Sequence, residues 1–282
     1  MHTERLTNVC GVQQVHVPGI SQARFRPAAK SGRLQGRGIV GGRMAQLFSA
    51  WWSNADGGKT FRPRYSHKPG SRQLRLHHTA ERTLGSGNLR MAVALPEGED
   101  LNEWLAVKTV DLFNEVALVY GMVSEFCTEH SCPKMCAGSR FEYKWGDGVT
   151  YKTPTEVSAP KYVELLMAWV KKQLDDPTRF PVEPGAPFPP NFREMVSNIC
   201  RRLFRVYGHV FYSHRERVIE LTFDAHLHSC FKHFMYFILE YSLVRAEELQ
   251  PLQPLIDKLL AEDDAKWGPR SAPKQAGAPS AA

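Results

Sequence analysis

The chain has 282 residues, 43% of them hydrophobic and 23% charged, which is ordinary globular usage and excludes disorder of the whole chain. Its longest mainly apolar run, 234–244, contains Glu240 and is too short to span a bilayer. The first twenty residues lack the apolar segment of a signal peptide, so we expect no secretion. The net charge of +7 is uneven: residues 1–90 carry +12 and residues 91–282 carry −5. Basic charge suited to nucleic acid is therefore confined to the N-terminal part.

Residues 1–43 contain scattered Gly, Pro and Arg, a single acidic residue and no sustained periodicity. This composition predicts a disordered basic leader. An organellar transit peptide has a similar composition, but no convincing amphipathic stripe is present. Met44 is an alternative start, so the leader need not belong to the native protein. Residues 44–71 then predict an extended arm.

Helical periodicity and turn signals divide the residues that follow. We predict a short helix over 73–84, ended by the glycines of 85–87, and a long amphipathic helix over 100–120. The helical spacing of the long helix is carried by Leu101, Leu105, Leu112, Val116 and Val119. The alternating residues 141–145, the turn residues 146–148 and residues 149–151 predict a small β-hairpin.

The second half reads as further helices. Ser158 is a candidate N-cap of a helix that begins at Ser158-Ala159-Pro160 and ends near Leu174. The proline-rich residues 181–190 predict a loop, followed by helices over 191–211, 215–241 and, more briefly, 246–261. We therefore expect an all-α fold, a helical bundle with one small β-hairpin, over 72–262, and a disordered tail over 263–282.

Two pairs of metal-ligand residues are separated by about eighty positions. Cys127 and Cys132 lie in a predicted loop, and His209 and His214 follow much later. Two thiolates and two imidazoles complete a tetrahedral zinc shell of the structural type. Residues five apart on a helix point about 140° away from each other. The two histidines can therefore share an ion only if the helix ends or bends between them, and Tyr212-Ser213 is a suitable place.

This spacing leaves alternatives open. The rival ligands are Cys136, His130, His226, His228 and His233, and Cys127 and Cys132 also fit ordinary buried thiols. A zinc hydrolase is disfavoured, because the chain has no His-Glu-x-x-His motif and a Cys2His2 shell leaves no position for an activated water.

Two helix faces carry opposite charge. Glu99, Glu103 and Asp111 fall within about 120° of arc beside Trp104, which suits a groove for a basic partner helix. Arg201, Arg202 and Arg205 fall within about 100° of arc on another helix, and their guanidinium groups suit phosphate. The alternative for both faces is an ordinary solvated surface. The acidic residues would then stabilise the N-terminus of their helix, and the arginines would form local ion pairs with residues such as Glu194.

Several uncommon blocks occur in a characteristic order and resemble the Mob (Mps one binder) kinase-activator family, over about residues 59–260. The similarity is greatest to the branch that co-activates NDR/LATS-type kinases. The blocks are LPEGEDLNEW (95–104), EFCTE (125–129), SAPKY (158–162), FPPNF (188–192), RLFRVY (202–207) and FKHF (231–234).

This resemblance implies a non-catalytic adaptor with a four-helix-bundle core and one structural Zn²⁺. By matching position, the zinc ligands are Cys127, Cys132, His209 and His214. The surface that receives the basic N-terminal region of the kinase maps to Glu99, Glu103, Trp104 and Asp111. The site for a phosphorylated, Hippo-like upstream kinase maps to Arg201, Arg202 and Arg205, with arginine at position 201 where lysine is common.

The resemblance also implies phosphorylation of Thr60 and Thr83. A phosphate would change how a basic arm sits against an acidic core, so the arm around Thr60 would cover the acidic face until it is modified. The expected function is kinase co-activation in Hippo or mitotic-exit type signalling, in the cytoplasm, with the nucleus as a second candidate compartment. The alternative is nucleic-acid binding by the basic leader.

Overall fold

The computed structural model describes residues 88–183 and 185–269, so the leader, the arm and the predicted helix over 73–84 lie outside the described residues. The described part is all-α, as predicted, and none of its helices is long and apolar enough to cross a membrane. The elements are α3 (Leu89–Val93), α4 (Leu101–Val123), α5 (Ala159–Leu174), α6 (Phe192–Ser213), α7 (Arg215–Glu220), α8 (Asp224–Glu240), α9 (Ala246–Leu249), the 3-10 helix η1 (Gln250–Leu252) and α10 (Gln253–Trp267).

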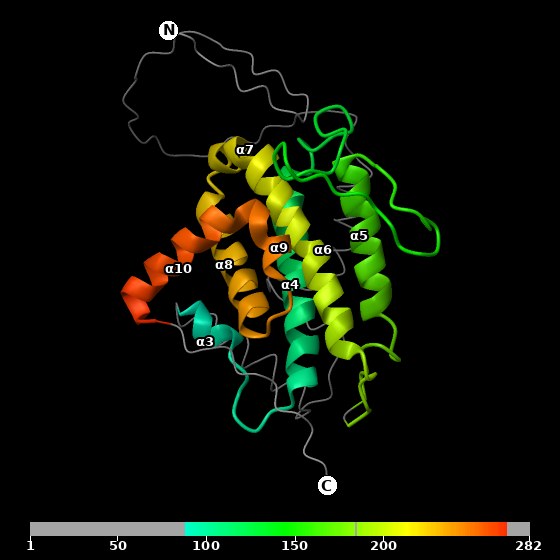
Figure 1. Ribbon diagram of the computed structural model, residues 1–282, viewed down its shortest axis with the longest axis vertical. Coiled ribbons are helices and arrows are strands. Elements are labelled where there is room, and N and C mark those ends of the chain that lie inside the picture. Colours follow the sequence, from blue (N-terminus) through cyan, green and yellow to red (C-terminus); the bar gives the residue numbers. More distant parts are fainter. Residues whose placement is uncertain (1–87, 184, 270–282) are drawn as a thin grey trace, which may run out of the picture.

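Helix α4 lies at the centre of the described part and packs against α5, α6 and α8, while α3 packs against α8 (Figure 1). It begins at Asp100, whose carboxylate accepts hydrogen bonds from the backbone N–H groups of Asn102 and Glu103 at 2.9 and 3.1 Å. This cap satisfies two donors that have no partner within the helix. Because α4 has neighbours on several sides, most of its residues are buried, including polar ones.

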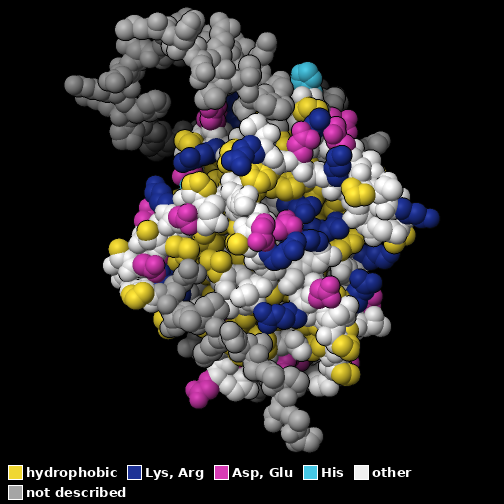
Figure 2. Space-filling view, in the orientation of Figure 1, with side chains coloured by type: hydrophobic (Ala, Val, Ile, Leu, Met, Phe, Trp, Pro, Cys, Tyr) yellow, Lys and Arg dark blue, Asp and Glu magenta, His cyan; other side chains and the backbone are white. Residues whose placement is uncertain are grey.

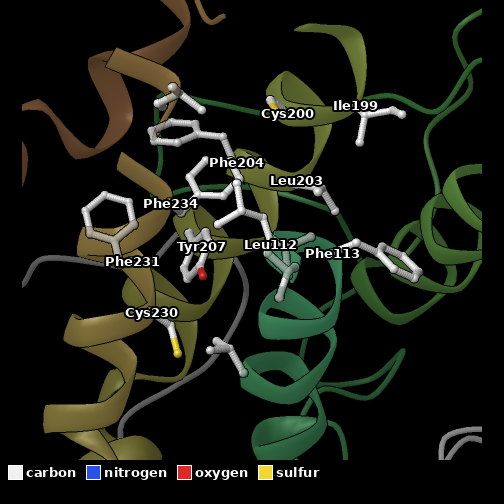
Figure 3. Close-up of a cluster of buried hydrophobic side chains, with 14 of the residues drawn as sticks. Leu112, Phe113, Ile199, Cys200, Leu203, Phe204, Tyr207, Cys230, Phe231 and Phe234 are labelled. Carbon is white, nitrogen blue, oxygen red and sulfur yellow. The ribbon is translucent and has the colours of Figure 1, made fainter. Parts of the chain in front are cut away.

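The core forms where α4, α6 and α8 meet. Figure 3 shows aromatic rings of α6 and α8 lying together, with Leu112 of α4 beside them. The ring of Tyr207 lies 5.3 Å from that of Phe231 and 5.2 Å from that of Phe234, in edge-on or tilted arrangements that aromatic pairs favour. This packing joins the helix that carries the arginines and histidines to the rest of the fold.

The predicted β-hairpin is not present as a pair of strands. The segment makes two isolated antiparallel bridges, Cys136 with Glu142 and Trp145 with Thr155. Asp147 does lie in a turn, where its carboxylate accepts from the backbone N–H groups of Val149 and Tyr151, each at 2.8 Å. Residues 149–151 therefore belong to this turn and cannot pair with 141–145, so Trp145 pairs further along the chain.

The single helix predicted over 215–241 is wrong, because α7 and α8 are separate. Thr222 adopts a left-handed conformation with φ 57°. The N–H of Phe223 donates to the Val218 carbonyl, and that of Thr222 donates to the Ile219 carbonyl, both at 2.9 Å. These two bonds form a Schellman motif, which ends a helix. Such motifs usually contain glycine, so a threonine gave no stop signal.

The helical part extends past the boundary expected at 262, since α10 continues to Trp267. Polar contacts hold this last turn: Lys232 pairs with Asp263, and Arg90 pairs with Asp264 at 2.7 Å and donates to the Gly268 carbonyl at 2.6 Å. Asp263 and Asp264, which lie beyond the expected boundary, therefore anchor α10 to α8 and α3.

Candidate functional site

A group of four buried donors lies at one end of α4 and α6. Cys127 follows the end of α4, with its N–H donating to the Val123 carbonyl at 3.0 Å, and Cys132 closes a turn by donating to the Thr128 carbonyl at 2.8 Å. His209 is in the last turn of α6, and His214 is the residue that follows the helix. The helix thus ends between the two histidines, as a shared ion requires.

The spacing of these donors fits one tetrahedral metal ion. Cys127 Sγ lies 3.5 Å from His209 Nε2, Cys132 Sγ lies 3.5 Å from His214 Nε2, and all four donor atoms are within 4.8 Å of one another. Bond lengths of about 2.3 Å to sulfur and about 2.0 Å to nitrogen place neighbouring donors of a tetrahedral zinc roughly 3.5 Å apart. The two sulfur–nitrogen distances match this spacing, and the 4.8 Å limit on the whole set means that binding needs at most small side-chain shifts.

The surroundings orient these donors. His209 Nδ1 donates to the Cys136 carbonyl at 2.9 Å, which leaves the lone pair of Nε2 facing Cys127. The hydrogen bond from the Cys127 thiol, together with His209 and His214, holds the pKa of Cys132 below its usual value. At least one thiolate is thus available as a ligand.

Two of the rival histidines have other partners. His233 Nδ1 lies 2.7 Å from a Glu115 carboxylate oxygen, and His228 Nδ1 lies 3.5 Å from an Asp224 oxygen. Across residues 88–183 and 185–269, the Cys2His2 group is the one set of donors close enough together for a metal.

The three arginines of α6 gather on the surface, two turns before the metal donors. Arg202 is held by Trp145 and Trp169, whose rings lie 4.9 and 4.6 Å from its guanidinium carbon, and it donates to the Gly146 carbonyl at 2.8 Å. Burial, and then the nearby charges of the other two arginines, lower its pKa. Cation–π contact with both indole rings, which are nearly perpendicular to each other, compensates for part of this loss of solvation.

Arg205 and Arg201 are held by separate groups. Arg205 donates to the Tyr162 hydroxyl at 3.0 Å and lies over the Tyr143 ring. Burial opposes its charge, but Tyr162 and Glu248 outweigh that effect, so its pKa lies above the usual value. Arg201 donates to the Asn198 side chain at 2.8 Å. Three guanidinium groups are therefore fixed in place by uncharged partners.

One carboxylate lies among these arginines, and it is not that of Glu194, which forms no ion pair with another described residue. Glu248 of α9 approaches Arg201 at 3.7 Å and Arg205 at 3.6 Å. Figure 2 shows basic side chains around acidic ones near the middle of this face, over α6 and α9. We call Arg201, Arg202 and Arg205 the arginine cluster.

The acidic residues of α4 lie deeper than expected. Glu99 is half-buried, whereas Glu103 and Asp111 are only 8% and 7% exposed. Trp104 lies in the core rather than beside a surface groove, with its indole N–H donating to the Val93 carbonyl at 3.0 Å. The structure therefore gives Trp104 a packing role, and its assignment to kinase binding stays a prediction.

Comparison with known proteins identifies the family. The Mob1/phocein family model matches residues 81–252. The chain belongs to the Mob1/phocein family. It is 56% identical over 202 residues to MOB kinase activator-like 1A of Medicago sativa subsp. falcata, and 55% identical over 203 residues to MOB kinase activator-like 1A of Arabidopsis thaliana, covering 72% of this chain and 94% of each relative. MOB kinase activator-like 1 homolog B of Dictyostelium discoideum is 54% identical over 206 residues, covering 73% of this chain and 95% of the relative.

Several functional contacts of this Mob protein were missed in the sequence. Trp145, Trp169 and Glu248 are 33 to 57 residues away from the arginines that they contact, so no local pattern joins them. A buried chain also escaped notice: Lys108 Nζ lies 3.4 Å from His233 Nε2, whose other ring nitrogen binds Glu115. Lys108 is fully buried although it lies between acidic residues of α4 in the sequence, and its pKa is lowered by loss of solvent.

Proposed function

We propose that this Mob protein is a non-catalytic adaptor and allosteric co-activator that binds the basic N-terminal region of an NDR/LATS-type Ser/Thr kinase. The observation that carries the proposal is its likeness, above 50% identity, to proteins called MOB kinase activators along 94% of their length. The family match also spans every proposed site residue except Thr60.

The kinase would bind at Glu99, Glu103 and Asp111, with Trp104 fixing the start of α4 from below. Glu99 lies just before α4, and Glu103 and Asp111 lie in its first three turns, whereas the kinase segment is basic. Opposite charge speeds encounter and sets the orientation of a partner, and apolar contacts then hold it. The acidic balance of residues 91–282 supports the same assignment.

Recruitment would occur at the arginine cluster, through a phosphorylated segment of an upstream Hippo-like kinase. The support is the geometry: three guanidinium groups face one surface, and each is already held by uncharged partners. A site organised before binding loses little side-chain entropy when phosphate enters. Bidentate arginine pairs are a frequent way to bind phosphate.

A structural Zn²⁺ would be held by Cys127, Cys132, His209 and His214. The support is that two sulfurs and two nitrogens lie at tetrahedral spacing and are buried. When bound, the ion would supply a crosslink between the loop after α4 and the end of α6, and four protein ligands leave no place for a substrate.

The upstream kinase would also phosphorylate Thr60 and Thr83, which lie outside the described residues. The arm around Thr60 carries Lys59, Arg62 and Arg64, so its charge is opposite to that of the acidic face. We place the protein in the cytoplasm and nucleus, in signalling of the Hippo or mitotic-exit type. Thr60→Glu should then tighten kinase binding, and an unchanged affinity would contradict control by this arm.

The decisive experiment is calorimetric titration of the full chain with the basic N-terminal segment of an NDR/LATS-type kinase. We expect binding that weakens with salt and falls at least tenfold in Glu103→Lys. Glu97→Lys makes the same charge change at an exposed position just before α4 and should have a smaller effect. Because Glu103 is buried, Glu103→Gln and thermal denaturation check that the loss is not unfolding. Equal losses in both lysine variants would contradict the assigned face.

A further inference from the structure

Glu248 bridges the arginine cluster from a different part of the chain. One carboxylate oxygen faces Arg201 at 3.7 Å and the other faces Arg205 at 3.6 Å, while Arg245 approaches the first at 3.9 Å. The Glu248 side chain is 22% exposed, and that of Arg205 is 17% exposed. A negative group thus already occupies the place where the proposed phosphate ligand would meet the guanidinium groups.

The carboxylate is attracted to the arginines but only loosely bound to them. All three separations exceed the distance of a good hydrogen bond, so these contacts are ion pairs without close donation. The backbone beneath is firm, because the neighbouring Leu249 and Leu252 are buried in the core. The Glu248 side chain can therefore leave the arginines without unfolding α9.

The arginines do not depend on Glu248 for their positions. Their hydrogen bonds to Asn198, Gly146 and Tyr162 do not involve the carboxylate, and neither do the cation–π contacts of Arg202 with two indoles. The Nε atoms of all three are buried without a hydrogen-bond partner. These Nε atoms are enclosed, but Arg201 Nη1 and Arg205 Nη2 face Glu248 at ion-pair distance without a close hydrogen bond. Their donor capacity remains for a phosphate, which offers three oxygens and nearly two charges.

We propose that Glu248 is an intramolecular competitor for the arginine cluster, an internal carboxylate that a phosphorylated segment must displace. The inference rests on the phosphopeptide role proposed above and adds its regulation. A carboxylate ligand that displaces Glu248 forms the same kind of ion pairs and gains little binding free energy. A phosphate dianion carries more charge and accepts hydrogen bonds from more of the arginine donors. Glu248 lowers the affinity of the arginine cluster for every anion by the same factor. Carboxylate ligands, which bind weakly, therefore become ineffective.

The test compares Glu248→Gln with Glu247→Gln, which makes the same charge change at the exposed neighbouring residue. The probe is a fluorescent phosphothreonine peptide from the Hippo-like kinase, titrated into the full chain. We expect Glu248→Gln to bind it roughly 5-fold to 10-fold more tightly, the effect of releasing two modest ion pairs, and Glu247→Gln to differ less than about 2-fold. Glu248→Ala should give the same gain, and thermal denaturation confirms folding.

A second probe separates displacement from simple repulsion. The second probe is a peptide with Glu in place of the phosphothreonine, and its binding is measured by chemical-shift titration. Its affinity for Glu248→Gln should exceed that for the wild type by the same factor. A gain for the phosphopeptide alone would overturn the inference, since a fixed negative charge repels a dianion more than a monoanion. If the wild type binds the phosphopeptide and the Glu248 variants bind no more tightly than Glu247→Gln, the inference fails and the proposed function stands. If no variant binds, both fail.

Discussion

The metal-donor group and the arginine cluster are built on the same helix, α6, but they differ in how their charges are compensated. The four metal donors are buried and face one another, and their polar neighbours are backbone carbonyls and hydroxyls. The arginines lie nearer the surface, are stacked on aromatic rings and meet a single carboxylate at ion-pair distance. One site is complete in itself, and the other keeps unused donors.

This difference indicates which site supports the fold and which can exchange a ligand. A closed set of four ligands has no vacant position, so its free energy contributes to stability. An open set of fixed guanidinium groups contributes little to stability and can bind an anion instead. Changes in the two groups should therefore affect different measurements.

The largest expected effect is loss of the metal-donor group. Cys132→Ser should lose bound zinc and lower the melting temperature by at least about 10 °C, because a structural metal stabilises the fold by several kcal/mol. Elemental analysis should give one zinc per chain in the wild type. The control is Cys200→Ala, which removes another buried thiol of α6, one whose pKa burial raises to about 12, and should keep the zinc. A wild type that melts at the same temperature with and without chelator would contradict this assignment.

Removing an arginine should weaken phosphopeptide binding without affecting the metal. Arg205→Ala should weaken phosphopeptide binding at least tenfold, since a charge-assisted hydrogen bond contributes about 1.5 to 3 kcal/mol, and should leave the zinc content unchanged. Arg179→Ala is the control, because Arg179 forms an exposed ion pair with Asp176 and should bind like the wild type. Fluorescence anisotropy and elemental analysis measure the two quantities. Zinc loss in Arg205→Ala would show that the sites are not separable.

Gly208 lies between the two sites and tests their boundary. A Cβ there would come within 3.0 Å of the Ala137 side chain, next to the carbonyl that orients His209. Gly208→Ala should cost about 1 to 2 kcal/mol and weaken zinc retention against a chelator. Gly121→Ala is the matched control, because Gly121 lies inside α4 with open space around its Cβ position. This variant should stabilise the protein by up to about 1 kcal/mol. Equal stabilities of the two variants would contradict this packing.

The smallest effect is expected away from both sites. Thr222→Gly should relieve the left-handed strain between α7 and α8 and raise the melting temperature by about 2 to 4 °C, for roughly 1 kcal/mol. Thr222→Ala keeps a side chain in the same conformation and should give no such gain. Zinc content and phosphopeptide affinity should match the wild type in both, and a change in either would link this turn to the sites.

Local signals in the sequence were enough for much of the helical framework. Apolar spacing predicted α4, Ser158 with the proline after it predicted the start of α5, and proline-rich residues marked the loop before α6. The requirement that a helix end between His209 and His214 followed from helical geometry alone and is confirmed. Each of these features depends on residues within a few positions of one another.

Other features depended on backbone hydrogen bonds that residue preferences do not announce. Helix α7 ends at a left-handed threonine because the N–H of Phe223 donates to the Val218 carbonyl. Trp145 paired with Thr155 because the turn at Asp147 took up the nearer residues.

The sequence by itself indicated the family and, through that resemblance, the four candidate metal donors, while the spacing of apolar residues indicated most of the helices. Only the tertiary structure decided that Trp104 is buried, that Lys108 is joined to Glu115 through His233, and that Glu248 lies among the arginines. The physical reason is that charge compensation and burial depend on which helices become neighbours, and packing of the whole core sets that arrangement.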